Sequence, residues 1–186
     1  ETLQIRDLGV EGAQYPQVAG RAPVLAFVAA ESTTRIYRVS LPARGTGAAP
    51  RPEHVFASTG VDAFPSVSPD GRLIAFLSDR SGSPRLWIAD LATAPDARPV
   101  EAVVPRLRYP VAWSPDGNRL LMAGRDAGRD RLYEVDAATA HAVELPLPEG
   151  APTYASYLGG MADLLVVADR GSGRLRLTRY DIAQTP

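Results

Sequence analysis

The chain has 186 residues, a formal net charge of −1, 45% hydrophobic residues and 22% charged residues. This composition is that of a globular protein with a sizeable core, and it excludes extensive disorder and a cationic, nucleic-acid-binding chain. Cysteine is absent, which excludes disulfides, thiolate catalysis and cysteine-based metal sites. No apolar run reaches the ~18 residues that a membrane span needs, so we expect no span in this chain.

A strand-like piece, 1–10, precedes four repeats that start roughly 45–49 residues apart, which is near the length of a propeller blade. Each repeat opens with an aromatic residue: Tyr15, Phe64, Tyr109 and Tyr154. We therefore predict a single domain with blades at 11–55, 56–104, 105–148 and 149–186. In one arrangement, residues 1–10 form a spare outer strand that closes the last blade of a four-bladed ring. The same order of strands also arises when the chain is part of a longer propeller that is divided between the third and fourth strands of a blade.

The second repeat shows the expected blade in detail, with strands predicted at 65–68, 72–78, 85–91 and 99–104. The second of these strands is apolar at successive positions, as are its equivalents in the later repeats. A strand that is apolar on both faces lies between two covering layers, as in stacked propeller blades. The predicted fold class is all-β, a β-propeller of four-stranded antiparallel blades, with about four blades in this chain.

The tetrapeptide Ser-Pro-Asp-Gly occurs twice, at 68–71 and at 114–117, between the first and second strands of a blade. Proline presets the backbone for the first central position of a type I turn, and glycine accepts the left-handed conformation that closes a three-residue hairpin. We interpret the motif as a structural hairpin.

Other chemistries lack their motifs. Phosphate loops need a lysine, which the chain lacks, and an EF-hand needs alternating oxygen ligands and a late glutamate. The two histidines, His54 and His141, have no second ligand at metal-binding spacing. The serine at 172 lacks the Gly-x-Ser-x-Gly pattern, and the glycines at 45 and 47 lack a dinucleotide fingerprint. We predict no catalytic residue, no metal and no cofactor.

One constellation remains as a candidate binding site. In a four-stranded meander, the aromatic residues that open each blade and the turns between its second and third strands lie at the same end of the blade. This candidate rim consists of Phe64, Asp79, Arg80, Tyr109, Arg125, Asp126, Tyr154, Asp169 and Arg170. Aromatic and arginine side chains on a rim suit protein or peptide recognition. The alternative is that the aromatics pack between blades and each Asp–Arg pair closes its own turn.

The segments F-P-S-V-S-P-D-G-R-L-I-A-F-L-S-D-R and Y-P-V-A-W-S-P-D-G-N-R-L-L resemble the WD-repeat-like blades of the TolB propeller family. The amino-acid sequences of segments 55–71 and 124–136 look most like those of the periplasmic propellers of CadC-like winged-helix transcriptional regulators. The resemblance implies a periplasmic, non-catalytic binding or sensor module of such a membrane-anchored regulator. Its alternatives are a TolB-like envelope scaffold and the substrate-gating propeller of a prolyl-oligopeptidase-like peptidase.

A protein or peptide is the expected partner and a small ligand is the alternative, whereas we expect this chain not to bind nucleic acid directly. The sequence leaves the oligomeric state open. If the rim binds a partner, Arg80→Ala and Arg125→Ala should weaken its capture without lowering thermal stability. Loss of stability with unchanged capture would favour the packing alternative.

Overall fold

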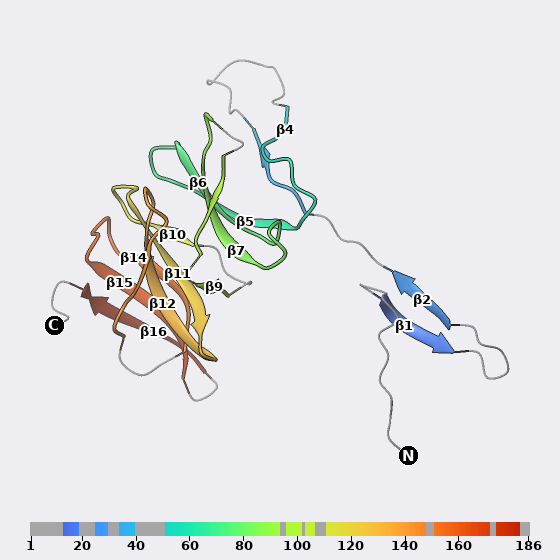
Figure 1. The fold of residues 1–186 in the computed structure, drawn as a ribbon. Coiled ribbons are helices and arrows are strands. Elements are labelled where there is room, and N and C mark those ends of the chain that lie inside the picture. The colour runs from blue at the N-terminus through green and yellow to red at the C-terminus, as the bar shows by residue number, and fades with distance from the viewer. Residues whose placement is uncertain are drawn as a thin grey trace. The chain divides into compact units, whose positions relative to one another are not determined.

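The repeats form successive antiparallel sheets, and the chain divides into two compact units, Glu1–Thr33 and Thr34–Pro186. The computed structural model describes residues 13–18, 25–29, 34–39, 51–93, 96–101, 103–106, 111–147, 151–171 and 174–182. No α-helix occurs within these ranges, and therefore no helix in them could cross a membrane. Figure 1 shows the sheets and the labels of their strands.

The first unit holds one hairpin, in which β1 (Ala13–Val18) pairs with β2 (Leu25–Ala29). The second unit begins with a short pair, β3 (Tyr37–Arg38) and β4 (Glu53–His54). The predicted blade 11–55 therefore has its first two strands in one unit and its last two in the other, so its formation as one blade stays a prediction. The predicted spare strand 1–10 lies outside the described residues.

Blade two is a four-stranded sheet in the order β5-β6-β7-β8, which confirms the predicted meander. Its strands are β5 (Asp62–Val67), β6 (Leu73–Ser78), β7 (Arg85–Asp90) and β8 (Arg98–Pro99). The first strand begins earlier than predicted because Asp62 and Ala63 already pair with Ser78 and Leu77.

Blade three repeats this order with β10 (Ala112–Trp113), β11 (Arg119–Asp126), β12 (Arg129–Asp136) and β13 (Ala142–Glu144). The connecting strand β9 (Val104–Pro105) pairs with the far end of β11. Blade four comprises β14 (Pro152–Tyr157), β15 (Leu164–Gly171) and β16 (Arg174–Asp181). In the part of the chain that the structure describes, β16 is the last strand of that sheet.

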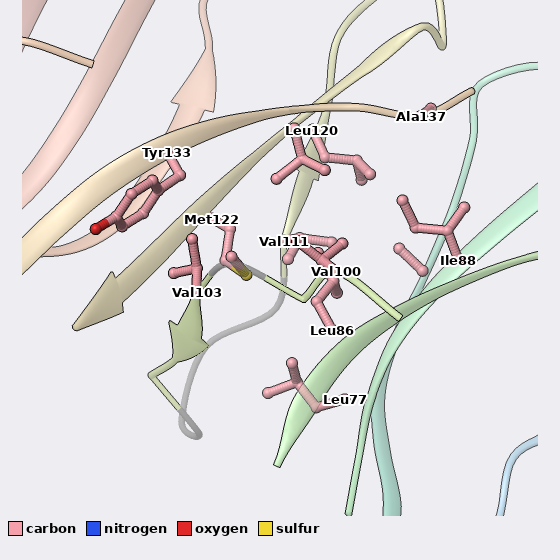
Figure 2. Packing of buried hydrophobic residues seen from close by; sticks show 12 residues of the cluster. Leu77, Leu86, Ile88, Val100, Val103, Val111, Leu120, Met122, Tyr133 and Ala137 are labelled. Atoms are coloured by element: carbon pink, nitrogen blue, oxygen red, sulfur yellow. The ribbon is translucent and has the colours of Figure 1, made fainter. Parts of the chain in front are cut away.

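The second strand of blade two is buried on both faces, as its sequence predicts. Ile74 and Phe76 pack with Ile36 and Phe56, which flank β3 and β4. The alternate residues Ala75 and Leu77 belong to a different cluster, which lies between blades two and three. Figure 2 shows this second cluster, in which Leu77, Leu86 and Ile88 of blade two meet side chains of blade three such as Leu120 and Met122.

A third apolar cluster joins blade three to blade four and contains Leu121, Leu132, Leu145, Ala155, Leu165 and Val167. Polar side chains reinforce these seams between blades. The Trp113 indole N–H donates to the carbonyl oxygen of Ser66 at 3.0 Å, from blade three to blade two. The Tyr157 hydroxyl donates to Glu134 Oε1 at 2.8 Å, from blade four to blade three. Burial raises the pKa of Tyr157 well above its ordinary value, and the bond to Glu134 adds to this shift.

Both Ser-Pro-Asp-Gly segments form the predicted hairpin. Gly71 N–H donates to the Ser68 carbonyl, and Gly117 N–H donates to the Ser114 carbonyl, each at 2.9 Å. The two glycines have φ values of 75° and 72°, in the left-handed region that glycine tolerates. A β-carbon on Gly117 would lie 3.6 Å from Pro69 Cδ, so the two turns lie side by side.

Candidate functional site

The aromatic residue that opens blade two lies at a β-bulge. The pairing of β5 with β6 slips between Ala63 and Ser66, and Phe64-Pro65 fill the gap. Proline has no N–H for the ladder, which explains why the register breaks here. Phe64 has a φ of 53° and is 39% exposed. A phenylalanine in the left-handed region is strained, and such strain gathers at functional sites.

The same bulge recurs in other repeats. In β1 the register slips between Gln14 and Gln17, around Tyr15-Pro16. In β14 it slips between Pro152 and Tyr154. In β1 and β5 the bulge coincides with an aromatic–proline dipeptide, a role that the sequence reading did not assign to it, whereas the bulge in β14 lies at Thr153 without such a dipeptide.

Arg80 points into blade two. Its Nη2 lies 2.9 Å from Asp62 Oδ1, and the Asp62 side chain is fully buried. Its Nε donates to Ser78 Oγ at 3.0 Å. The guanidinium carbon also lies 4.9–5.5 Å from the ring centroids of three aromatic residues, Phe56, Phe76 and Trp87. Such contacts favour a cation over aromatic faces, so Arg80 holds its own blade together.

Asp79 has a different partner from the one that the sequence suggested. Its Oδ1 accepts a hydrogen bond from Val61 N–H at 2.7 Å, while Arg80 turns away to Asp62. A β-carbon on Gly60 would lie 2.3 Å from that same oxygen, so only glycine allows this approach without a shift. Asp79 thereby fixes the segment that leads into the Phe64 bulge.

Beside these features, a pocket of about 180 Å³ opens to solvent at the end of blade two. Its lining residues are Val61, Ala63, Phe64, Leu77, Ser78, Asp79 and Pro84. Two residues of the predicted rim, Phe64 and Asp79, therefore do come together, and the pocket between them is mainly apolar.

On blade three, Arg125 and Asp126 are the last two residues of β11 rather than part of a turn, which corrects the sequence reading. The turn itself is Ala127-Gly128, whose φ values of 46° and 80° are those of a two-residue type I′ hairpin. Arg125 Nε lies 3.3 Å from Asp130 Oδ1, and the Arg125 side chain is 59% exposed.

Asp130 has a second, shorter ion pair, because Arg106 Nη1 lies 2.6 Å from its Oδ2. Arg106 also lines a small cavity with Thr153 and Tyr154 of blade four. Arg106 thus pairs with Asp130 of blade three and lines the same cavity as Tyr154 of blade four.

On blade four, Asp169 and Arg170 lie within β15, opposite Arg176 and Leu175, and not in the turn that the sequence suggested. The second strands of blades three and four are longer than that of blade two. The Asp and Arg residues of these blades therefore lie in the paired strands and not in the turn. Tyr109 lies outside the described residues.

Three residues of this region were missed by sequence reasoning: Asp62, Arg106 and Asp130. Asp62 lies 18 residues before its partner Arg80, and a single acid in a strand gives no signal that it is buried. The only hint was its place just before the aromatic–proline dipeptide.

The described residues contain no group of three or more histidine, cysteine, aspartate or glutamate side chains that could hold a metal ion. The ring of His54 is tilted by 43° relative to that of Tyr37, with ring centroids 5.5 Å apart, and His141 is exposed directly before β13. His141 contacts Thr139 and Asp136 through its backbone: its N–H donates to Thr139 Oγ1 at 3.3 Å, and its carbonyl oxygen accepts from Asp136 N–H at 2.9 Å.

The chain resembles proteins of known kind over part of their length. A TolB homologue of Chlorobium luteolum (strain DSM 273 / BCRC 81028 / 2530) is 51% identical over 39 residues, 21% of this chain and 9% of that protein. The structure of putative TolB from Agrobacterium tumefaciens matches with a TM-score of 0.63 at 20% identity, covering 87% of this chain and 55% of that one. The chain has a TolB-like β-propeller fold. No family model matches the chain.

The same fold also occurs in an enzyme. A puromycin-hydrolyzing peptidase of Mycobacterium tuberculosis matches with a TM-score of 0.58 at 18% identity, covering 95% of this chain and 28% of that one. The matched part is less than two thirds of each of these proteins, from 9% of the Chlorobium protein to 55% of the Agrobacterium one. At these identities the two structures establish the fold and leave activity open.

Proposed function

We propose that this chain is a non-catalytic, protein-binding propeller module of a TolB-like envelope scaffold, located in the periplasm. The observation that carries the proposal is its likeness to TolB in both sequence and structure, 51% identity over 39 residues and a TM-score of 0.63. Propeller blades are a scaffold that presents loops and strand ends on a rigid support.

The rim supports this proposal through its chemistry. Phe64 and Arg125 are exposed at the start of blade two and at the end of the β11–β12 hairpin. Aromatic and arginine side chains dominate the energetics of protein interfaces. Arg80 contributes indirectly, because it orders the pocket wall rather than facing solvent. The contribution of Asp126, Tyr154, Asp169 and Arg170 to binding stays a prediction.

Two other functions were expected from the sequence. The first, the sensor domain of a CadC-like regulator, was expected from sequence resemblance alone. The similarity in sequence and structure to TolB favours the scaffold function over it. A peptidase propeller is the second candidate, because the mycobacterial peptidase shares the fold. In that case catalysis would lie in a separate domain.

Arg125→Ala tests the proposal. The wild-type chain should co-purify with a defined protein of the cell envelope and should not hydrolyse puromycin or aminoacyl p-nitroanilides. Arg125→Ala should weaken that capture at least several-fold, and its unfolding free energy should stay within about 0.5 kcal/mol of wild type, because the ion pair is exposed and Asp130 retains Arg106.

Arg179→Ala is the matched control, since Arg179 is also exposed but lies on β16, away from the rim. Capture that is equal in both variants would contradict the use of the rim. Hydrolysis by the purified chain would contradict the non-catalytic function itself.

A further inference from the structure

We propose that the blade-two pocket, defined by the lining residues given above, receives an apolar side chain of a partner protein that carries a positive charge beside it. This inference rests on the proposed protein-binding function and specifies the chemistry that one part of the rim recognises.

The size of the pocket sets the kind of occupant. Its volume of 180 Å³ is below the roughly 300–1,000 Å³ typical of small-molecule sites. A single inserted side chain fits such a volume better than a drug-sized ligand does. Val61, Ala63, Leu77 and Pro84 supply apolar walls, as expected of a pocket that buries an anchor residue.

The charge of the pocket selects a cation. Asp79 is the one charged residue among those that line it. Arg80, its neighbour in the chain, is paired with Asp62 inside the blade, so it does not neutralise Asp79. In the hydrogen bond recorded for the Asp79 side chain, Oδ1 accepts from Val61 N–H. Among the described residues no cation is paired with Asp79, so a positive group at the pocket mouth would meet a carboxylate that these residues leave uncompensated, and charge complementarity favours a basic partner.

The pocket is also preorganised. The Asp79–Val61 hydrogen bond at 2.7 Å fixes one wall, and the Arg80–Asp62 pair at 2.9 Å fixes the turn that bears Asp79. Phe64 is held at φ of 53° at the bulge between them. A backbone strained at the mouth of a preformed pocket is an independent indication of a binding site.

The test uses three small probes with one leucine side chain each: leucinamide, which is cationic, N-acetyl-leucinamide, which is neutral, and N-acetyl-leucine, which is anionic. Binding to the isotopically labelled chain is followed by amide NMR shifts. Leucinamide should shift the amides of Val61, Ala63, Phe64 and Asp79 with saturation. The neutral probe should bind more weakly, and the anionic probe weakest.

Asp79→Asn keeps an oxygen that accepts from Val61 N–H but removes the charge, so it should abolish the preference for leucinamide over the neutral probe. Ala63→Leu should fill the pocket and remove the shifts of all three probes. Glu144→Gln, which removes an exposed carboxylate on β13 of blade three, should leave the order of the probes unchanged. Absence of shifts at the pocket amides, or equal binding of the cationic and anionic probes, would overturn the proposal.

Failure of this inference is separable from failure of the proposed function. If no probe binds but the envelope partner is still captured in an Arg125-dependent manner, the pocket assignment is wrong and the scaffold function stands. If leucinamide binds as described but no partner is captured, the pocket stands and the scaffold function is wrong.

Discussion

At the scale of single residues, Arg80 joins parts of blade two that are distant in sequence. Its guanidinium pairs with the fully buried Asp62 and lies over rings from β6, β7 and the segment before β5. Asp62 Oδ2 has no hydrogen-bond partner within the described part of the protein, so the buried charge of Asp62 is neutralised by Arg80. A buried ion pair adds little net stability, but loss of one partner leaves an uncompensated charge.

Arg80→Ala should therefore lower the unfolding free energy by about 3–5 kcal/mol, measured by chemical denaturation. This differs from the result that the sequence suggested, in which stability was unaffected. The double variant Arg80→Ala/Asp62→Ala should recover part of the loss, because it also removes the stranded carboxylate. A double variant that is less stable than Arg80→Ala would contradict this role of Asp62.

At the scale of elements, each Ser-Pro-Asp-Gly turn is a small hydrogen-bond network. Ser114 Oγ donates to Asp116 Oδ1 at 2.5 Å and accepts from Arg119 N–H at 2.9 Å. Ser68 and Asp70 repeat the first bond at 2.5 Å. The hydrogen bond from serine holds the pKa of Asp116 below its ordinary value, and the pKa of Asp70 likewise.

Ser114→Ala should raise the pKa of Asp116 toward its ordinary value, as measured by carbon NMR of the carboxyl group. It should lower the unfolding free energy at neutral pH by about 1–2 kcal/mol, because buried Ser114 makes both bonds.

Because the folded-state pKa of Asp116 is lowered, its stabilising effect is present above the unfolded pKa of about 3.9 and is lost as pH falls through the folded value. The stability gap between wild type and Ser114→Ala should therefore narrow as the pH falls below about 4. An Asp116 pKa that does not move in Ser114→Ala would contradict the network.

At the scale of the whole molecule, successive blades are joined by seams that use the same repeat position. Leu86 and Leu132 lie in the third strands of blades two and three. They pair with Leu77 and Ala123 of the neighbouring strands and are buried in the seams. Leu177 occupies the same position in blade four, opposite Ala168, but is 69% exposed.

The repeat therefore offers a matched pair of substitutions. Leu132→Ala should cost about 2–5 kcal/mol of unfolding free energy, since it opens a cavity in a seam. Leu177→Ala should stay within about 0.5 kcal/mol, because its side chain is exposed. Denaturation of both variants measures the difference, and similar losses would contradict the assignment of the seams.

The fold was predictable from the sequence because its signals are local. Pro69 and Gly71 specify a turn by their own backbone preferences, and the run from Leu73 to Leu77 shows by composition that both faces are covered. The bulge at Phe64-Pro65 was not recognised, although the lack of an N–H at proline provided the signal.

The site was less predictable because its contacts are long-range. The inward turn of Arg80 depends on an acid 18 residues earlier and on three rings from separate segments. The positions of Arg125 and Asp169 depend on hairpin length, which shifted them from the turn into the strand.

Site-specific photo-crosslinking in cells tests the central claim, that the rim is the working surface of a protein-binding module. Benzoylphenylalanine replaces Phe64 at the rim and, as the control, Val143, which is 54% exposed on the outer strand of blade three. We expect a discrete protein adduct from position 64, which is absent from position 143 and is lost when Ala63→Leu fills the pocket. No adduct from position 64, or the same adducts from both positions, would contradict it.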